Sequence, residues 1–317
     1  MKLTDIKTIT NVGAGTMGHA IALQFALAGY PVRLYDHKED GLQHGQAAIT
    51  SDLATFQKAG LLNEDPGAIL ARITPTTDLA AACRDADFVI ESVVEDQQVK
   101  QQVWQAIEQE VSSTAVLATN TSGLSPTALQ SVLKYPARFV VAHFWNPAQL
   151  MPLVEVVPGN ATSQETVDLT VALMNKIGKH AVPLKKAALG FVGNRIQLAV
   201  LREAFHIVDE GIASPEAVDD IVKYSLGRRW NLVGPIASAD LGGLDVFKNI
   251  SSYLYADLAN DTGTDSTLAK LVDHGKLGLK SGQGFYDWQG DAGKEVIANR
   301  DRKLLAQLKR DHDKRED

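Results

Sequence analysis

The chain has 317 residues, of which 45% are hydrophobic, a formal net charge of −7 and one cysteine, Cys83. A chain of this length exceeds what one hydrophobic core usually organises, so we expect two domains; the acidic balance argues against a nucleic-acid partner, and no apolar stretch is long enough to span a membrane. The single cysteine excludes an intrachain disulfide and a cysteine metal cluster, and, with no signal-peptide pattern at MKLTDIK, it predicts a cytoplasmic enzyme without a metal.

The first predicted strand, Ile6–Val12, leads directly into a glycine-rich loop with the sequence GAGTMG at residues 13–18. An apolar pattern of helical spacing follows this loop. A GxGxxG sequence between a strand and a helix is typical of dinucleotide-binding domains. The strand itself is unusual, because Thr8, Thr10 and Asn11 are polar for a central parallel strand, and the sequence alone does not explain them.

Each glycine of the loop has its own task in this motif. Gly13 permits the tight turn, Gly15 lets the backbone approach a pyrophosphate, and Gly18 allows close helix–strand packing. The N–H groups at the start of the helix supply an anion site. The next strand, Pro31–Tyr35, ends on Asp36, whose carboxylate can accept hydrogen bonds from a ribose diol and would repel a 2′-phosphate. We therefore predict NAD rather than NADP as the cofactor.

Helices and strands alternate up to about residue 185, which predicts a doubly wound parallel sheet of the Rossmann type. Thr162 and Glu165 form a predicted capping box for the last helix of this part, which Gly178 closes. The other predicted elements are a helix at 41–60, a strand at 87–91, a helix at 96–111, a strand at 115–119 and a helix that opens at Ser125-Pro126.

The pattern changes after Gly190, where apolar residues recur at helical spacing and no convincing strand follows Pro183. We therefore predict an NAD-binding domain at 1–185 and an all-helical domain at 186–317 for substrate binding and dimerisation. The closing run from Arg300 mixes both charge signs and predicts a solvent-exposed helix.

The segment FVVAHFWNPAQLMPLVEVVPG, residues 139–159, sets His143 at the end of one apolar run and Glu155 inside another. Both runs are typical of short buried strands, and Pro147 and Pro152 force a turn between them. A carboxylate on a neighbouring strand can take one ring N–H of an imidazole, fix its tautomer and stabilise the imidazolium, which makes the histidine a general base. Taken alone, the pair is also consistent with a satisfied core histidine and a carboxylate matched to an arginine.

Seven further motifs follow one another along the chain: ESVVEDQQVK (91–100), TNTSGL (119–124), HFWNP (143–147), PLVEVVPG (152–159), GFVGNRI (190–196), GPIASADLGGLD (234–245) and KSGQGFYDW (280–288). With GAGTMG they resemble the short-chain 3-hydroxyacyl-CoA dehydrogenases, which include the bacterial 3-hydroxybutyryl-CoA dehydrogenases. The resemblance implies NAD-dependent oxidation of the 3-hydroxyl of a short-chain (S)-3-hydroxyacyl-CoA, and the reverse. It further implies a site in a cleft between the domains and a homodimer joined through the helical domain.

The resemblance also implies a role for each site residue. His143 corresponds to the catalytic base and Glu155 to its carboxylate partner, while Ser122 and Asn194 hold the reacting oxygen of the substrate. Cofactor-binding residues are Gly13, Gly15, Thr16, Met17, Gly18, Asp36, Glu95, Lys100 and Asn120. Substrate-binding residues are Ser122, Asn146, Asn194 and Lys58. Without the resemblance, Ser122 would be interpreted as a turn serine, Asn194 as a polar group at a helix start and Lys100 as a surface lysine.

Two departures from the family keep a second substrate class open. Trp145 stands where the family reads HFFNP. The helical pair that the resemblance places beside CoA, around residues 45–72, offers only Lys58 and Arg72 to the nucleotide phosphates. Relatives of this fold that oxidise gulonate, carnitine or pyridine alcohols do not use CoA, so a non-CoA hydroxy compound is the alternative substrate.

Two other classes of protein are weaker interpretations. The β-hydroxyacid dehydrogenases related to 6-phosphogluconate dehydrogenase share a similar glycine-rich start, but they use a lysine in the helical domain as base. The His143 and Glu155 pair argues against them. A non-catalytic, NAD-sensing protein would tolerate the loss of His143 or Ser122, and both are present.

Overall fold

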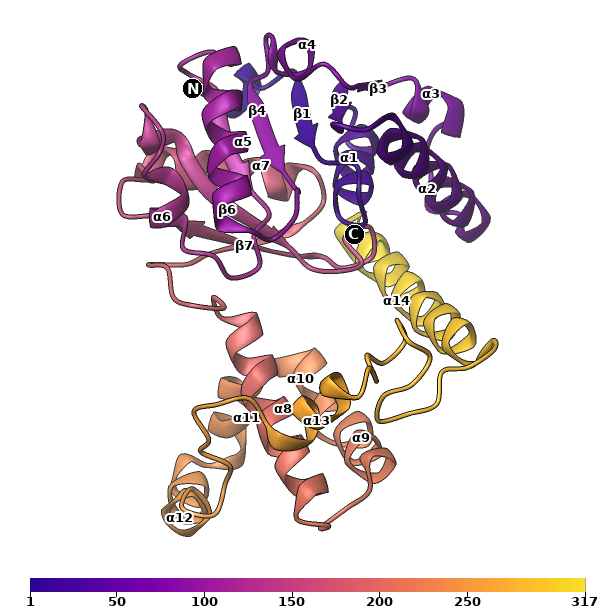
Figure 1. Cartoon of the computed structure of the whole chain (residues 1–317), viewed down its shortest axis with the longest axis vertical. Coiled ribbons are helices and arrows are strands. Elements are labelled where there is room, and N and C mark those ends of the chain that lie inside the picture. Colours follow the sequence, from indigo (N-terminus) through magenta and orange to yellow (C-terminus); the bar gives the residue numbers. More distant parts are fainter. Residues whose placement is uncertain (317) are drawn as a thin grey trace. The chain divides into compact units, whose positions relative to one another are not determined.

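The computed structural model describes residues 1–316, which divide into two compact units (Figure 1). Unit 1 comprises Met1–Val192 and the chain from Arg300 onward, and unit 2 comprises Gly193–Asn299. The change of unit after Val192 follows the expected boundary at residue 185, and the chain from Arg300 onward is grouped with unit 1. The linker stays with unit 1 because Phe191 packs in its core and the N–H of Val192 donates to Glu155 at 3.0 Å.

Unit 1 is built on one eight-stranded sheet with the order β3-β2-β1-β4-β5-β6-β7-β8. The strands are β1 (Ile9–Val12), β2 (Val32–Tyr35), β3 (Ile73–Thr76), β4 (Phe88–Glu91), β5 (Val116–Thr119), β6 (Phe139–Phe144), β7 (Leu153–Pro158) and β8 (His180–Pro183). All neighbours are parallel except β6 and β7. The strand order reverses at β1 and β4, so the crevice at their carboxyl ends is the expected ligand site of such a sheet.

Helices cover both faces of this sheet, which confirms the predicted α/β fold (Figure 1). Those of unit 1 are α1 (Gly18–Leu27), α2 (Glu39–Ala59), α3 (Pro66–Leu70), α4 (Leu79–Cys83), α5 (Gln97–Glu110), α6 (Pro126–Gln130) and α7 (Gln164–Lys176). Apolar side chains of α1, α2 and α7 form one core, and those of α4, α5 and α6 form another. β1, β4 and β5 are buried on both faces, as central parallel strands require.

The structure corrects the predicted elements at two places. β3 and α4 lie outside the predicted set, because each has only four or five residues and carries no periodic signal; α3 falls within the helical pair expected around residues 45–72. The predicted capping box is also wrong. Ser163, not Thr162, is the N-cap of α7 and accepts from the N–H of Thr166, whereas the hydroxyl of Thr162 donates to the carbonyl of Phe139 at 2.6 Å.

The polar residues of the first strand have defined partners. The hydroxyl of Thr10 donates to the carbonyl of Ala82 in α4 at 2.5 Å, which ties the strand to its covering helix. The side-chain amide of Asn11 donates to the carbonyl of Gly13 at 2.7 Å. Both residues are fully buried, so these bonds offset the cost of burying their donor groups; the side-chain oxygen of Asn11 has no hydrogen-bond partner among the described residues. The amide of Asn11 supports the first turn of the glycine-rich loop.

Unit 2 is helical, as predicted. It contains α8 (Gly193–Asp209), α9 (Pro215–Tyr224), α10 (Leu226–Val233), α11 (Pro235–Gly242), α12 (Leu244–Leu254), α13 (Ser266–Asp273) and the start of α14 (Ala292–Glu316). In the described part of the chain no sheet strand follows β8; only isolated bridges occur, around Gln283. No helix of the described residues is both long and apolar enough to cross a membrane.

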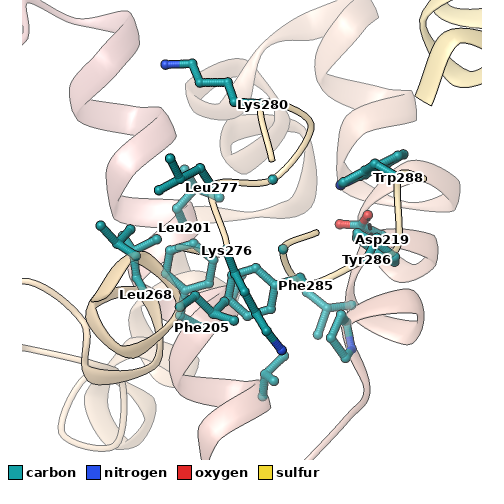
Figure 2. Close-up of a pocket in the computed structure, with 18 residues that line it drawn as sticks. Leu201, Phe205, Asp219, Leu268, Lys276, Leu277, Lys280, Phe285, Tyr286 and Trp288 are labelled. Atoms are coloured by element: carbon teal, nitrogen blue, oxygen red, sulfur yellow. Dashed lines mark hydrogen bonds between the residues drawn. The ribbon is translucent and has the colours of Figure 1, made fainter. Parts of the chain in front are cut away.

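The motif KSGQGFYDW packs inside unit 2 and borders an apolar cavity of about 550 Å³ (Figure 2). Phe285 stacks on Phe205 of α8 with ring centroids 5.1 Å apart. The hydroxyl of Tyr286 donates to Asp219 of α9 at 2.9 Å, and burial, followed by this bond, raises the pKa of Tyr286 to about 12. The motif thus joins two helices of unit 2.

The last helix, α14, returns to unit 1 in its second half. Leu304, Leu305 and Leu308 pack against the core that lies under α1 and α2. The ammonium of Lys309 lies 3.5 Å from the carbonyl of Ala59, at the end of α2, where a cation is favourable. The expectation of a fully solvent-exposed helix is therefore wrong for this face of α14.

Candidate active site

The three glycines of the loop meet the three demands of a dinucleotide site. Gly13 has φ of 102°, and a Cβ there would lie 2.8 Å from the carbonyl oxygen of Ser92. A Cβ at Gly18 would lie 1.8 Å from the carbonyl oxygen of Gly13, whereas a Cβ at Gly15 would meet nothing within 4 Å. The backbone at Gly15 is thus open to a pyrophosphate, next to the start of α1. Thr16 is exposed and Met17, the N-cap of α1, is half-buried.

Asp36 directly follows β2 and borders this loop. Its carboxylate accepts from the N–H groups of Ala14 at 3.0 Å and Lys38 at 3.1 Å, and it lies 3.2 Å from Nδ1 of His37. Its side chain is 15% exposed, which leaves an edge of the carboxylate for a ribose diol. The open loop, the helix start and this carboxylate together fit an NAD molecule.

His143 and Glu155 lie directly opposite each other in the antiparallel β6–β7 pair. Nδ1 of His143 is 3.0 Å from Oε2 of Glu155, and the two residues are 4% and 2% exposed. An ionised carboxylate only accepts hydrogen bonds, so Nδ1 carries the proton and Nε2 is the acceptor. The predicted arrangement of an imidazole faced by a carboxylate from a neighbouring strand is present in the fold.

The surroundings hold this pair rigidly. Glu155 also accepts from the indole N–H of Trp145 at 3.3 Å and from the N–H of Val192 at 3.0 Å. The imidazole also contacts the rings of Trp145 and Phe191, with centroids 5.6 Å and 5.5 Å away. Trp145, which departs from the family pattern, therefore belongs to the support of Glu155.

Three predicted residues lie at the carboxyl ends of β4 and β5. Oε1 of Glu95 accepts from the N–H of Ser122 at 2.7 Å and from the hydroxyl of Thr121 at 2.6 Å. Oδ1 of Asn120 accepts from the N–H of Phe144 at 2.8 Å, next to His143. Because β6 is parallel to β5, the structure brings the Ser122 loop and His143 to the same edge of the sheet.

Lys100 is not the surface lysine that its sequence context alone suggests. Its side chain is 1% exposed, and its ammonium lies 2.6 Å from Oε1 of Glu91 and 3.4 Å from Oε2 of Glu95. It also donates to the carbonyl of Val93 at 3.2 Å. Lys100 is thus directed to two carboxylates of unit 1.

Of the remaining predicted residues, two lie in unit 1 and one lies in unit 2. Lys58 is exposed in the last turn of α2, and Asn146 is exposed at the cis peptide before Pro147. Asn194 lies in the first turn of α8, in unit 2. It follows Val192 by two residues, and Val192 is the residue held by Glu155.

Glu91 and Phe191 contribute to the site but are absent from the predicted set. Glu91 is the fully buried last residue of β4, and Phe191 is a buried aromatic with φ of 52°. A carboxylate that ends an apolar strand run was a usable signal for Glu91. The sequence carried no comparable signal for Phe191, because its role depends on how the linker folds back over β6 and β7.

The comparisons with known proteins agree with this geometry. Residues 8–187 match the family model of the 3-hydroxyacyl-CoA dehydrogenase NAD binding domain, and residues 190–288 match the model of the 3-hydroxyacyl-CoA dehydrogenase C-terminal domain. Together these two models cover most of the chain.

Relatives of different kinds are similar in sequence, and they include the following two. A 5-formyl-3-hydroxy-2-methylpyridine 4-carboxylate 5-dehydrogenase of Mesorhizobium japonicum is 34% identical over 301 residues, which are 95% of this chain and 97% of that protein. A probable 3-hydroxybutyryl-CoA dehydrogenase of Deinococcus radiodurans is 39% identical over 278 residues, which are 87% of this chain and 98% of that protein.

Solved structures show the same two kinds. A 5-formyl-3-hydroxy-2-methylpyridine 4-carboxylic acid 5-dehydrogenase, described as an NAD⁺-dependent dismutase, has a TM-score of 0.91 at 32% identity and covers 97% of this chain and 99% of its own. An (S)-3-hydroxybutyryl-CoA dehydrogenase from Ralstonia eutropha has a TM-score of 0.75 at 35% identity, covering 90% and 100%. This chain therefore belongs to the 3-hydroxyacyl-CoA dehydrogenase family and is an NAD-dependent oxidoreductase that acts on CH–OH groups.

Proposed function

We propose that the chain interconverts a short-chain (S)-3-hydroxyacyl-CoA and the corresponding 3-ketoacyl-CoA, with His143 as the general base. The buried His143–Glu155 pair carries this proposal. Because Glu155 holds the proton of Nδ1, Nε2 takes the hydroxyl proton during oxidation, and the resulting imidazolium is stabilised by the carboxylate. During reduction the imidazolium returns this proton to the forming alkoxide. NAD, when bound, supplies the hydride acceptor.

Ser122 and Asn194 are the residues proposed to hold the reacting oxygen of the substrate. Ser122 is suited to this role because its main chain is fixed by Glu95 at 2.7 Å. Asn194 is suited because it lies in the first turn of α8, the helix that directly follows the Glu155-bound Val192. Asn120 braces the start of the HFWNP turn at Phe144. For Glu95, Lys100 and Asn146 we propose the cofactor and substrate contacts that the family resemblance implies.

A non-CoA hydroxy compound is a second candidate substrate, and three observations favour it. The middle of α2 carries Asp52, which accepts from Gln149 at 3.2 Å, where a phosphate-rich substrate would prefer a cation. Lys309 of α14 contacts the carbonyl of Ala59, so α14 occupies the end of the same helix. The pyridine carboxylate dehydrogenase of M. japonicum spans 95% of this chain, more than the CoA dehydrogenase of D. radiodurans.

The comparison of kcat/KM for acetoacetyl-CoA, free acetoacetate and a panel of free hydroxy acids and pyridine alcohols separates the two candidates. If CoA is recognised, the thioester wins by at least about tenfold, since one charge-assisted contact is worth about 1.5–3 kcal/mol, and Lys58→Ala raises its KM. A free acid as the best substrate would leave the base assignment intact and overturn the CoA assignment. No turnover of any compound would favour a binding protein.

We also propose that two copies associate through unit 2 in the cytoplasm. Among the described residues of unit 2 only Gly293 is buried. Large apolar side chains of four of its helices are more than half exposed: Ile221, Leu232, Ile236, Leu241, Leu244 and Tyr253. Apolar surface on this scale marks an association site, and a second copy covers it in the proposed dimer. The buried thiol of Cys83, whose pKa burial raises to about 12, suits a reducing compartment.

A further inference from the structure

A buried charge network lies behind the Ser122 loop, at the carboxyl ends of β4 and β5. Glu91 is fully buried, and its carboxylate accepts from Lys100 at 2.6 Å, from the hydroxyl of Thr119 at 2.7 Å and from the N–H of Val93 at 2.7 Å. Every oxygen of this carboxylate therefore has a donor, and the ammonium of Lys100 has a counter-charge.

A buried ion pair contributes little net stability compared with apolar side chains of similar volume. Stability alone therefore does not account for Glu91 and Lys100 at this place. What distinguishes the pair is its second carboxylate, because Oε2 of Glu95 lies 3.4 Å from the same ammonium. Lys100 thus ties a fully buried carboxylate, Glu91, to one that is 43% exposed, Glu95.

Glu95 links the Glu91–Lys100 pair to the active-site loop, residues 121–124. Its Oε1 accepts from the N–H of Ser122 and from the hydroxyl of Thr121, whose oxygen in turn accepts from the N–H of Leu124 at 3.1 Å. The main chain of Glu91 also contacts the residue that follows β5, since its carbonyl accepts from the N–H of Asn120 at 2.8 Å.

We propose that Glu91 is a positioning residue for the reaction. Through Lys100 it fixes the Glu95 carboxylate, and through Glu95 it fixes the main chain of Ser122 in the orientation that the reacting oxygen needs. The role of Ser122 rests on the proposed function. The restraint on the loop rests on the hydrogen bonds alone.

Glu91→Gln is the central variant, and Glu108→Gln is its matched control. Glu108 is a carboxylate of the same unit with a side chain that is 11% exposed. It pairs with Arg138 at 3.3 Å and accepts from the N–H groups of residues 134–135, and none of these bonds reaches the Ser122 loop. Both substitutions remove the charge of a carboxylate that is paired with a cation, so both lower the melting temperature. Only Glu91→Gln is expected to lower kcat, by about 10- to 100-fold, the effect of misplacing a reacting group by about 1 Å.

Two further measurements distinguish a positioning role of Glu91 from a general loss of stability. In a Ser122→Ala background, Glu91→Gln lowers kcat much less than in the wild type, because the group that it positions is gone. An equal loss in both backgrounds overturns the proposal, and so does a variant with lowered melting temperature and unchanged kcat.

Amide hydrogen exchange tests the restraint without reference to any activity. Glu91→Gln is expected to speed exchange in the segment Thr121–Leu124, whereas Glu108→Gln leaves it unchanged; equal exchange in both overturns the proposal. If Ser122→Ala has wild-type turnover while Glu91→Gln speeds exchange as expected, the proposed role of Ser122 in the reaction is wrong. The proposal that Glu91 holds the loop in place is then still supported. Should Glu91→Gln not fold, Thr119→Val serves instead, because it removes one hydrogen-bond donor to the carboxylate of Glu91. It is expected to lower kcat and to speed exchange of the loop in the same way, but by smaller amounts.

Discussion

His143 is held by three different kinds of contact, which together leave one nitrogen for chemistry. Its Nδ1 faces Glu155 at 3.0 Å, its ring contacts the rings of Trp145 and Phe191, and its strand β6 is paired with β7. An imidazole fixed in this way keeps one tautomer and one orientation through the reaction.

The strongest prediction at this scale concerns the base itself. His143→Gln is expected to lower kcat by about 10²–10⁴, the usual contribution of a general base, while affinity for NADH stays nearly intact. Steady-state NADH absorbance and cofactor titration measure the two quantities. His180→Gln, at an exposed histidine of β8, is the control. A loss of less than about tenfold for His143→Gln would mean that another group is the base.

Asp36 decides between the two nicotinamide cofactors. Its carboxylate faces the glycine-rich loop through the N–H of Ala14, so a 2′-phosphate would meet a negative charge there. We expect the wild type to have a much higher kcat/KM with NADH than with NADPH. Asp36→Ala should make the two values more alike, because it weakens binding of NADH and removes the repulsion of the 2′-phosphate of NADPH. The measurement is kcat/KM with NADH and NADPH, and equal use of both by the wild type contradicts the assignment.

At the scale of elements, His19 joins α1 to α2 beside the glycine-rich loop. Its Nε2 lies 3.4 Å from Asp52 of α2, and its Nδ1 is 2.9 Å from the carbonyl of Gly15. Burial acts to lower the pKa of His19, but the bonds to Asp52 and to Gly15 outweigh it, and the pKa lies above its ordinary value. The protonated ring is therefore the form that ties the two helices together.

The sign of the pH effect follows from this raised pKa. A group whose pKa is higher in the folded state stabilises the fold fully below its unfolded pKa, about 6.5, and loses this contribution as pH rises through the folded value. We expect His19→Gln to lower the melting temperature more at about pH 5.5 than at about pH 8.5. An equal decrease at both pH values would show that the neutral ring serves as well.

The second half of α14 is a further element whose contribution can be measured. Leu308 packs on the core of unit 1 and borders a cavity of about 470 Å³ beneath α14. We expect Leu308→Ala to destabilise unit 1 by about 2 kcal/mol, at the low end for leucine because the site is only partly buried. Denaturant unfolding measures the change, and Arg310→Ala, at an exposed residue of the same helix, is the control.

At the scale of the whole molecule, the helical unit lacks a closed core of its own. Ile236 and Leu232 are both 80% exposed, although each is an apolar residue that folding normally buries. We expect light scattering to give twice the mass of one chain and Ile236→Glu to shift it toward the monomer. Tyr135→Glu, at an exposed aromatic of unit 1, should leave the dimer intact. A monomeric wild type would contradict the proposed association.

The sequence by itself determined those features that depend on local order along the chain. The glycine-rich loop, the alternation that builds the sheet and the His143–Glu155 pair are set by residues close in sequence, whose spacing repeats the period of the element they form. Short elements could not be predicted from such spacing. β3 has four residues and contains Pro75, so neither an alternation of apolar and polar residues nor a high strand propensity marks it.

Only the tertiary structure decided which polar residues meet. Asn11 and Thr10 look misplaced in a central strand until the carbonyls of Gly13 and Ala82 are seen beside them. Lys100 resembles a surface lysine until the fold closes it against Glu91. The contact of Thr10 with Ala82 joins residues 72 positions apart, and that of Lys100 with Glu91 joins α5 to the end of β4. A buried polar group is tolerated only because the folded chain supplies its partner, and no local pattern of residues encodes the partner of Thr10.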